Sequence, residues 1–136
     1  MRLIAIGTVV ILAMIGCTTS AGGEEELVGR VWTLESIEGF TSFPSDVATP
    51  TIRFAPDGLL SGNTGCNGGG AAYRIEGDNL LVIEPMTMTK RACANPEGNR
   101  LERAYVAAVQ NAHSFRVTST TLELLNESGE VLARFR

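Results

Sequence analysis

The chain is poor in the side chains that carry most enzymatic and nucleic-acid chemistry. Its 136 residues include one histidine and one tryptophan, and 11 lysines and arginines stand against 15 acidic residues, for a formal net charge of −4. Binding to the phosphates of nucleic acid needs a cluster of lysine and arginine side chains. The chain has a single lysine, Lys90, and scattered arginines, so we exclude nucleic acid as a partner. We interpret the one adjacent basic pair, Lys90-Arg91, as a solvated loop.

Familiar catalytic motifs are also missing from the sequence. It contains no Gly-x-Ser-x-Gly, His-Glu-x-x-His or Walker pattern. The sole histidine, His113, has no acidic neighbour in sequence, and we expect a polar surface or capping residue there. We therefore expect no enzymatic activity, no cofactor and no metal. Hydrolysis by a carboxylate pair stays an open alternative, because pairing among the acidic residues depends on geometry.

The long apolar run that is present lies at the start of the chain. After Met1 and Arg2, residues 3–15 form an apolar stretch of about 13 residues, the length of a signal-peptide core and short of the roughly 20 residues that span a bilayer. We therefore expect residues 1–16 to be a signal peptide that is removed. Removal takes away Arg2 and leaves the remaining chain more acidic.

The residues around Cys17 resemble the bacterial lipobox, in which a small residue precedes a cysteine that is acylated and becomes the new N-terminus. The segment reads Ala13-Met14-Ile15-Gly16-Cys17, and Thr18 follows. An ordinary signal peptide containing a cysteine is the alternative. Several acyl chains make membrane attachment durable. The absence of Asp after Cys17 resembles lipoproteins sent to the outer membrane, so we expect a lipid anchor on its periplasmic face.

Composition divides the rest of the chain into a tether and one domain. Residues 18–26, TTSAGGEEE, show no apolar periodicity and are rich in Gly, Ser and Thr, which is typical of a flexible linker. The expected organisation is a signal peptide at 1–16, the lipidated cysteine and tether at 17–26, and a single folded domain at 27–136.

Three cysteines become two once Cys17 is acylated. Cys66 and Cys93 then remain in a compartment where disulfides persist, and we expect them to pair. Closing a loop of about 28 residues stabilises a domain by roughly 3 to 4 kcal/mol in the chain-entropy model. Zinc ligation with His113 and a redox dithiol are the alternatives. Structural zinc needs four ligands, and neither cysteine has the Cys-x-x-Cys spacing of a catalytic dithiol.

From residue 27 onward the pattern is that of an antiparallel sheet interrupted by one helix. Short segments rich in Val, Ile, Leu, Phe and Thr alternate with Gly, Asn, Asp and Pro turns. We expect a mainly β domain of the α+β class: a small antiparallel sheet of about eight strands, strongly bent or closed into a barrel, with one helix packed on it. The predicted strands are 30–37, 51–54, 59–62, 71–75, 79–83, 114–118, 121–125 and 131–135.

Asn95-Pro96 marks the expected start of the helix, with a capping side chain before a proline at the first helical position. The helix should run to about Ala112 and pack one apolar stripe on the sheet. That stripe consists of Leu101, Tyr105, Ala108, Val109 and Ala112, and the polar side chains that mostly occupy the opposite face are Glu97, Arg100, Glu102, Arg103 and Gln110. Residues 40–50 are predicted to form a surface loop, with Phe40 and Phe43 across one end of the barrel.

Five separated motifs resemble the META domain family, also called HslJ-like, over about residues 28–135. They are Trp32-Thr33-Leu34; Thr51-Ile52-Arg53-Phe54; Asp57-Gly58-x-x-Ser61-Gly62-x-x-Gly65-Cys66-Asn67 with Tyr73; Met86-Thr87-Met88-Thr89-x-x-Ala92-Cys93; and Glu102-x-x-Tyr105. The resemblance implies a compact β-rich domain, often an envelope lipoprotein, linked in some members to heat shock, antibiotic tolerance or virulence, with no established catalytic activity. The chain departs from the family pattern at residues 68–72 and at Arg91.

Within these motifs the residue types themselves indicate scaffold. Gly58, Gly62 and Gly65 suit tight turns, bulges or close backbone approach, and Trp32 is large enough to anchor a small core. Asn67 beside a disulfide cysteine is expected to organise a loop formed by Gly68, Gly69 and Gly70 by capping its backbone. We take that loop as the candidate binding loop.

Two functions fit these observations. We expect a monomeric, lipid-anchored envelope protein that acts as a non-enzymatic interaction or stress-related module and contacts another envelope protein or the cell wall. The alternative is a carrier of a lipid or other small apolar ligand inside the barrel. An empty apolar cavity favours the carrier and a filled core favours the module. The residues that would line or fill such a cavity are Leu80, Val82, Leu122, Leu124 and Leu132.

Overall fold

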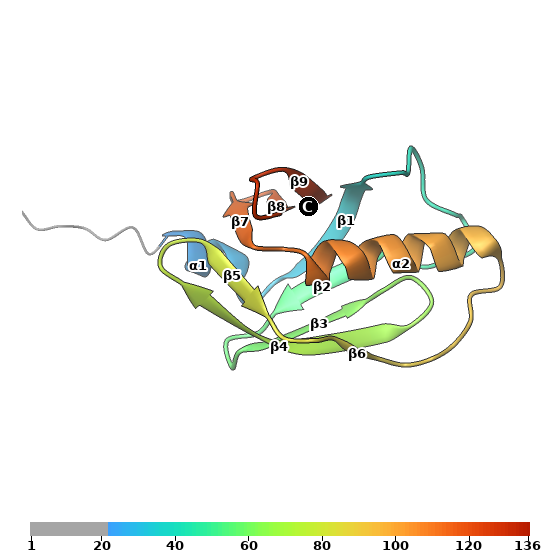
Figure 1. Cartoon of the computed structure of the whole chain (residues 1–136), viewed down its shortest axis with the longest axis horizontal. Helices are drawn as coiled ribbons and strands as arrows, with labels where there is room; N and C mark the ends of the chain where they lie inside the picture. Colours follow the sequence, from blue (N-terminus) through green and yellow to red (C-terminus); the bar gives the residue numbers. More distant parts are fainter. Residues whose placement is uncertain (1–21) are drawn as a thin grey trace, which may run out of the picture.

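The computed structural model describes residues 22–136 and contains nine strands and two helices in that range (Figure 1). The expected signal peptide, Cys17 and the first part of the tether lie outside the described residues. The strands are β1 (Val31–Ile37), β2 (Thr51–Phe54), β3 (Leu59–Asn63), β4 (Gly68–Glu76), β5 (Leu80–Ile83), β6 (Thr87–Met88), β7 (Ser114–Val117), β8 (Leu122–Leu125) and β9 (Val131–Phe135). The helices are α1 (Gly22–Leu27) and α2 (Pro96–Gln110).

Eight of these strands close into an antiparallel barrel. Their order is β3-β2-β1-β9-β8-β7-β5-β4, and pairing between β3 and β4 completes the ring. The ninth strand, β6, pairs with β4 through Gly69↔Met88 and Gly70↔Thr87. The predicted mainly β fold with a helix packed on it is therefore confirmed. Closure gives all eight barrel strands a partner on both sides and so removes exposed sheet edges.

Helix α2 packs on the barrel beside β1 and β9. Strands β5 and β7 share the single register pair Leu80↔Ser114. Near its end α2 contacts the segment after β5, because the Gln110 side chain accepts from Met86 N at 3.0 Å. On its other side Tyr105 packs edge-on against Phe135 of β9, with ring centroids 6.5 Å apart. The helix therefore lies between the β5–β6 side and the β9 side of the barrel.

The capping residue and the proline that predicted helix α2 are both found at its start. Asn95 has extended backbone dihedrals and its side chain accepts from Gly98 N at 2.7 Å, and Pro96 is the first helical residue. These are an N-cap and a proline at a position that needs no N–H donor. Four stripe residues, Leu101, Tyr105, Ala108 and Val109, are buried within the helix, and Ala112 is buried just beyond it. The helix ends at Gln110, two residues earlier than expected.

The barrel interior is filled by its own side chains. Aromatic residues from four strands and from α2 meet there, joined by leucines, isoleucine and valine. The largest side chains below 2% exposure are Trp32, Tyr105, Phe54, Phe115, Phe135, Leu27, Ile52, Leu60, Leu101, Leu122, Leu124 and Val109. Burying each such side chain stabilises the fold by about 1.5 to 3 kcal/mol.

In strand β5, the side chain that faces the barrel interior is not the one expected to line a ligand cavity. Leu81 is 2% exposed and points inward, whereas Leu80 is 42% exposed on the outside. Val82 is half-buried, and so is Leu132, which lies beside α2. Of the five side chains suggested as a cavity lining, Leu122 and Leu124 belong to the packed interior.

Two local expectations are wrong, and one strand was missed. Gly68–Glu76 is one continuous strand, so the three glycines are part of β4 and not a loop. The short strand β6 was not predicted. Residues 22–26, assigned to the flexible tether, begin helix α1, whose Leu27 is completely buried and whose Gly23 lies against the ring of Phe115.

Candidate functional site

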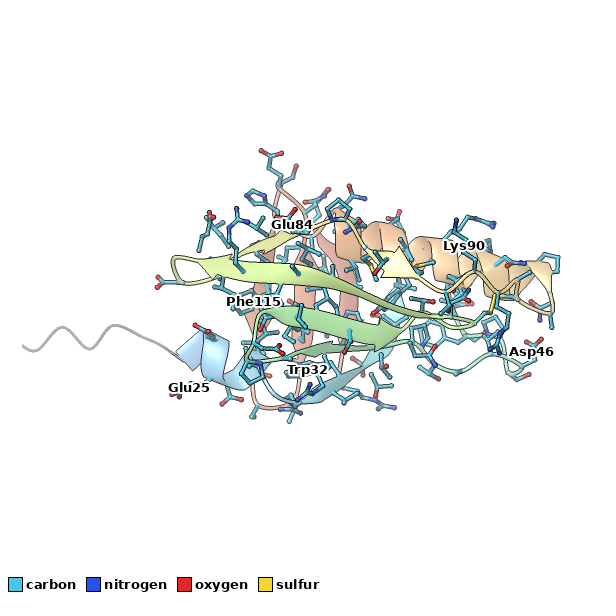
Figure 2. The ribbon with its side chains drawn as sticks, turned by 90° about the horizontal axis from the view of Figure 1, so that it is seen from below. Glu25, Trp32, Asp46, Glu84, Lys90 and Phe115 are labelled. Atoms are coloured by element: carbon cyan, nitrogen blue, oxygen red, sulfur yellow. A yellow bond between two sulfur atoms is a disulfide. The ribbon has the colours of Figure 1, made fainter. Side chains whose placement is uncertain are left out.

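Two unusual features meet at the end of the molecule away from α1: a disulfide and a network of polar side chains that includes the buried Thr64 and Asn67. Figure 2 shows the sulfur–sulfur bond near Asp46, with Glu25 of α1 at the opposite end. We call the second feature the polar node. It comprises Thr64, Asn67, Thr89 and Glu102, together with the backbone of Arg91.

The disulfide joins Cys66, in the β3–β4 turn, to Cys93, just before α2. The two Cα atoms are 5.4 Å apart, within the normal range for a disulfide. The predicted pairing is confirmed, and zinc ligation by these thiols is wrong for this state because both sulfurs are in the bond. Among residues 22–136 there is also no group of three or more His, Cys, Asp and Glu side chains placed to hold a metal.

Asn67 is the centre of the polar node and uses both ends of its amide. Its Oδ1 accepts from Arg91 N at 2.7 Å and from Thr89 Oγ1 at 3.0 Å. Its Nδ2 donates to Arg91 O at 2.7 Å and to the Glu102 carboxylate oxygens at 2.9 and 3.0 Å. The side chain therefore ties the segment before α2, and α2 itself, to the β3–β4 turn.

Glu102 and Thr64 complete the node from opposite sides. Thr64 is fully buried, and its Oγ1 contacts both Glu102 Oε1 and the Asn67 carbonyl oxygen. Asn67 is 7% exposed. Every buried side-chain nitrogen and oxygen in the described part of the chain has a hydrogen-bond partner. A satisfied network of this kind fixes one geometry, and removing a single member leaves buried groups unpaired.

The expected role of Asn67 is thus only partly right. Asn67 is structural, but its side chain clamps residues 89–91 and Glu102, and it does not cap a loop of Gly68, Gly69 and Gly70. Glu102 was assigned to the solvent-facing side of the helix. No sequence signal marks its partnership, because the two residues lie 35 positions apart.

The glycines near the node allow the strands to approach closely. A Cβ at Gly70 would lie 2.9 Å from Leu60 O, and one at Gly62 would strike Thr51 O and lie 2.8 Å from Tyr105 Oη. Gly58 and Gly65 have φ of 81° and 118°, so tight backbone geometry at these two positions and close approach at Gly62 agree with the expectation for the three glycines. The candidate binding loop is instead a strand under a shallow, open hollow shared with residues 87–89.

Two tyrosines, the fully buried Tyr105 and the half-buried Tyr73, donate to backbone carbonyls in the barrel wall. Tyr105 Oη donates to Thr51 O, and Tyr73 Oη donates to Ala55 O, both at 2.7 Å. Burial raises the pKa of the Tyr105 phenol well above its usual value. Burial also raises the pKa of Tyr73, aided by the nearby charges of Glu24 and Asp57. Both phenols are therefore held in the protonated, donating form.

A groove runs along the disulfide and is open to solvent. Its volume is about 340 Å³, and three segments line it: residues 46–48, 65–66 and 91–94. Its lining includes small residues and also the charged Asp46 and Arg91. Both cysteines of the bond contribute to the lining, so the disulfide is reached from this groove.

The other side chains that the sequence drew attention to lie outside the polar node. His113 is exposed, and its backbone bonds to Leu81 and Leu125. Lys90 and the Arg91 side chain are exposed. Phe40 and Phe43 pack partly buried against the core, where the Arg100 guanidinium lies 4.4 Å above the Phe40 ring. The one hydroxyl–carboxylate pair in the node, Thr64 with Glu102, is shielded from solvent by the burial of Thr64.

These features define a class: a closed antiparallel barrel with a packed interior, one long helix packed on it and a disulfide-linked end. The sequence profile of the META domain matches residues 25–136. The chain therefore belongs to the META domain family, as its motifs indicated.

Known proteins similar to the chain support both the sequence and the fold assignment. Heat shock protein HslJ of Escherichia coli K12 is 27% identical over 127 residues, covering 91% of this chain and 89% of that protein. One NMR structure has a TM-score of 0.63 at 25% identity and covers 82% of this chain and 92% of its own. A Burkholderia xenovorans NMR structure has a TM-score of 0.63 at 22% identity, covering 86% of each chain.

Proposed function

We propose that this protein is a lipid-anchored envelope protein whose META domain is a non-enzymatic interaction module. The observation that carries the proposal is the packed barrel interior, in which the largest side chains of the barrel strands and α2 are below 2% exposed. A filled barrel of this width holds no ligand, so the working surface is the outside of the domain. The chemistry expected at that surface is recognition of another envelope protein or of the cell wall.

The proposed anchor would orient the domain. Cys17 precedes Gly22 by so few residues that the intervening chain spans at most roughly 17 Å when extended. Helix α1 would thus stay near the bilayer, and the end with the disulfide would face away from it (Figure 2). None of the helices within residues 22–136 is long and apolar enough to cross a membrane. Lipid attachment at Cys17 is thus the proposed membrane contact.

The anchor is tested by replacing Cys17 with serine and following membrane fractionation and incorporation of a labelled fatty acid. We expect the wild-type chain to pellet with membranes and to carry label, and the C17S chain to lose both. Washing both membrane fractions with high salt is the control for loose adsorption. Label retained in C17S would overturn the anchor.

The interaction is tested by placing a photo-crosslinking amino acid at Ala92, in the groove, and in a matched chain at Ser119, on the β7–β8 turn. We expect covalent adducts with an envelope protein or cell-wall material from Ala92 and few from Ser119, in cells grown with and without heat stress. If neither position gives adducts above background in either condition, the interaction module is rejected.

A stress role is the second part of the proposal, and it rests on similarity to a protein whose name is heat shock protein HslJ. We expect the amount of this protein to rise several-fold after a temperature upshift. Quantitative immunoblotting against a constitutive envelope protein measures it. An unchanged ratio at all time points contradicts the stress role and leaves the interaction proposal standing.

The carrier alternative predicts a bound apolar molecule. Because the side chains occupy the barrel, we expect native mass spectrometry of protein purified from the envelope to give the mass of the lipidated chain alone. An additional, reproducible ligand mass lost on denaturation would favour the carrier.

A further inference from the structure

We propose that the Cys66–Cys93 disulfide is exchangeable in the folded protein: a thiolate of a thioredoxin-type dithiol protein attacks Cys66, and Cys93 leaves. The inference goes beyond the proposed interaction function, because it concerns the chemistry of the bond itself and does not depend on lipid attachment. Three observations carry it: access to the bond, the surroundings of each sulfur, and what holds the domain together once the bond is open.

Access comes from the groove. Residues 46–48, 65–66 and 91–94 surround an open hollow of about 340 Å³ with both cysteines in its lining. A disulfide sealed in a core is reached only after unfolding, whereas the half-buried Cys66 of this one lines a groove that is open to solvent. Exchange requires the attacking thiolate to reach a disulfide sulfur, and the groove brings solvent to both cysteines of the bond.

The two sulfurs have different surroundings. Cys93 is 9% exposed, and Cys66 is half-buried. Cys93 packs against the first turn of α2, since a Cβ placed at Gly98 would lie 3.2 Å from Cys93 Sγ. The N-terminus of a helix stabilises a thiolate, and a more stable leaving thiolate departs faster. Cys66 is therefore the sulfur that is attacked, because it is the more exposed. Cys93 is the leaving sulfur, because the helix N-terminus stabilises its thiolate.

The polar node keeps both halves of the broken bond in place. Asn67, next to Cys66, is bonded to Arg91 N and O, two residues before Cys93. Cys93 N itself donates to Asn99 Oδ1 in α2 at 3.1 Å. These contacts do not involve sulfur, so they persist after reduction. The reduced thiols stay close enough to re-form the bond, and the barrel strands are not part of the movement.

The electron balance of the exchange is complete. The thiolate of the dithiol protein forms a bond with Cys66 Sγ while the Cys66–Cys93 bond breaks, and its electron pair goes to Cys93 Sγ. The second thiol of the dithiol protein then attacks the mixed disulfide and releases Cys66 as a thiolate. The domain gains two electrons and two protons in all, and the dithiol protein becomes a disulfide.

The site of attack is tested by incubating the oxidised, non-denatured chain with a thioredoxin whose second active-site cysteine is replaced by serine. Peptide mass mapping of the trapped complex, with the Cys17 peptide scored separately, locates the linkage. We expect the linkage at Cys66 and a free Cys93. Linkage mainly at Cys93 overturns the proposed direction, and no complex in native buffer overturns exchange in the folded state.

The dependence of the disulfide reduction rate on thiol concentration distinguishes exchange in the folded chain from exchange that requires unfolding. With reduced glutathione we expect the rate to rise in proportion to the thiol concentration. A rate that levels off at the global unfolding rate, measured in the same buffer, would show that only the unfolded chain reacts and would overturn the proposal.

A matched pair of single-cysteine chains tests the difference between the sulfurs. In a C17S background, C93S leaves Cys66 as the free thiol and C66S leaves Cys93. We expect Cys66 to react with an aromatic disulfide reagent at least about tenfold faster than Cys93, since exposure limits attack. Equal or reversed rates contradict the access argument. If either chain lacks the circular dichroism of the wild type, mapping on the wild-type chain decides.

Discussion

The two ends of the molecule are held together by different physical means. At the α1 end, large apolar groups meet: Leu27 and Trp32 are completely buried, and Trp32 Nε1 donates to Leu27 O at 3.0 Å. At the far end, the buried residues include Thr64 and Asn67, and the chain is joined by a disulfide. Apolar packing defines the first end, and directional bonds define the second.

This difference indicates where the domain can change without losing its fold. Hydrophobic burial is cooperative across the barrel, so a defect near Trp32 weakens every strand that packs on it. The polar node and the disulfide act on the β3–β4 turn and the segment before α2. Opening that end should therefore be a local event, while the barrel persists.

The largest expected effect is in the apolar end. Trp32→Ala removes a fully buried indole from the core and should lower the free energy of unfolding by about 3 to 5 kcal/mol. Urea unfolding followed by circular dichroism measures it. The neighbouring Val31, 58% exposed, is the matched control, and V31A should change stability by less than about 0.5 kcal/mol. Similar losses in the two variants would contradict the packed core.

The second largest loss of stability is expected when the Cys66–Cys93 disulfide is removed. Replacing both Cys66 and Cys93 with serine should lower the free energy of unfolding by roughly 3 to 4 kcal/mol, because the unfolded chain loses its closed loop. The native circular dichroism spectrum should be retained. Wild-type protein with and without reductant gives the matched comparison. A disordered spectrum in the reduced protein would show that the far end is not separable from the barrel.

The third largest loss of stability is expected from a change in the polar node. Asn67→Asp replaces the Nδ2 donor with a carboxylate facing Glu102 and should cost about 2 to 3 kcal/mol at neutral pH. Adding E102Q restores a donor–acceptor pair with residue 67 and should recover part of the loss, because the bond from Nδ2 to Arg91 O stays lost. The control N63D keeps the oxygen that accepts from Gly65 N and should be nearly neutral. Additive losses in N67D/E102Q would disprove direct coupling.

The smallest effect concerns Tyr105, which links α2 to the barrel wall. Tyr105→Phe removes the bond to Thr51 O and should cost about 1 kcal/mol at neutral pH. Burial raises the pKa of Tyr105 in the folded state, so its stabilising contribution is present below the unfolded value of about 10 and is lost as pH rises above it. Chemical denaturation at several alkaline pH values should give a flatter decline for Y105F than for wild type. Parallel curves would contradict the burial argument.

Much of the fold could be predicted because local signals agreed with tertiary packing. The bounds of β2 and β9 match the predicted 51–54 and 131–135, and Asn95-Pro96 correctly marks the start of α2. Strand β5 shows where pattern fails. Its four apolar residues show no alternation, so the sequence does not indicate which of Leu80 and Leu81 points inward.

Several errors lie at the far end, where long-range contacts decide the structure. Three successive glycines have low strand propensity, yet Gly68–Gly70 pair with β3 on one side, and Gly69 and Gly70 with β6 on the other. Glu102 lies among charged helix residues and has the pattern of a solvated side chain until Asn67 approaches it. The disulfide was predictable from the cysteine count, whereas the polar node beside it needed coordinates.

The most direct test of the difference between the two ends is hydrogen–deuterium exchange, read by mass spectrometry, on the folded protein with the disulfide oxidised and then reduced. The account predicts faster exchange on reduction in residues 43–48, 64–67 and 89–99, with β1, β8 and β9 unchanged. Faster exchange throughout the barrel strands, or no change beside the cysteines, would contradict it.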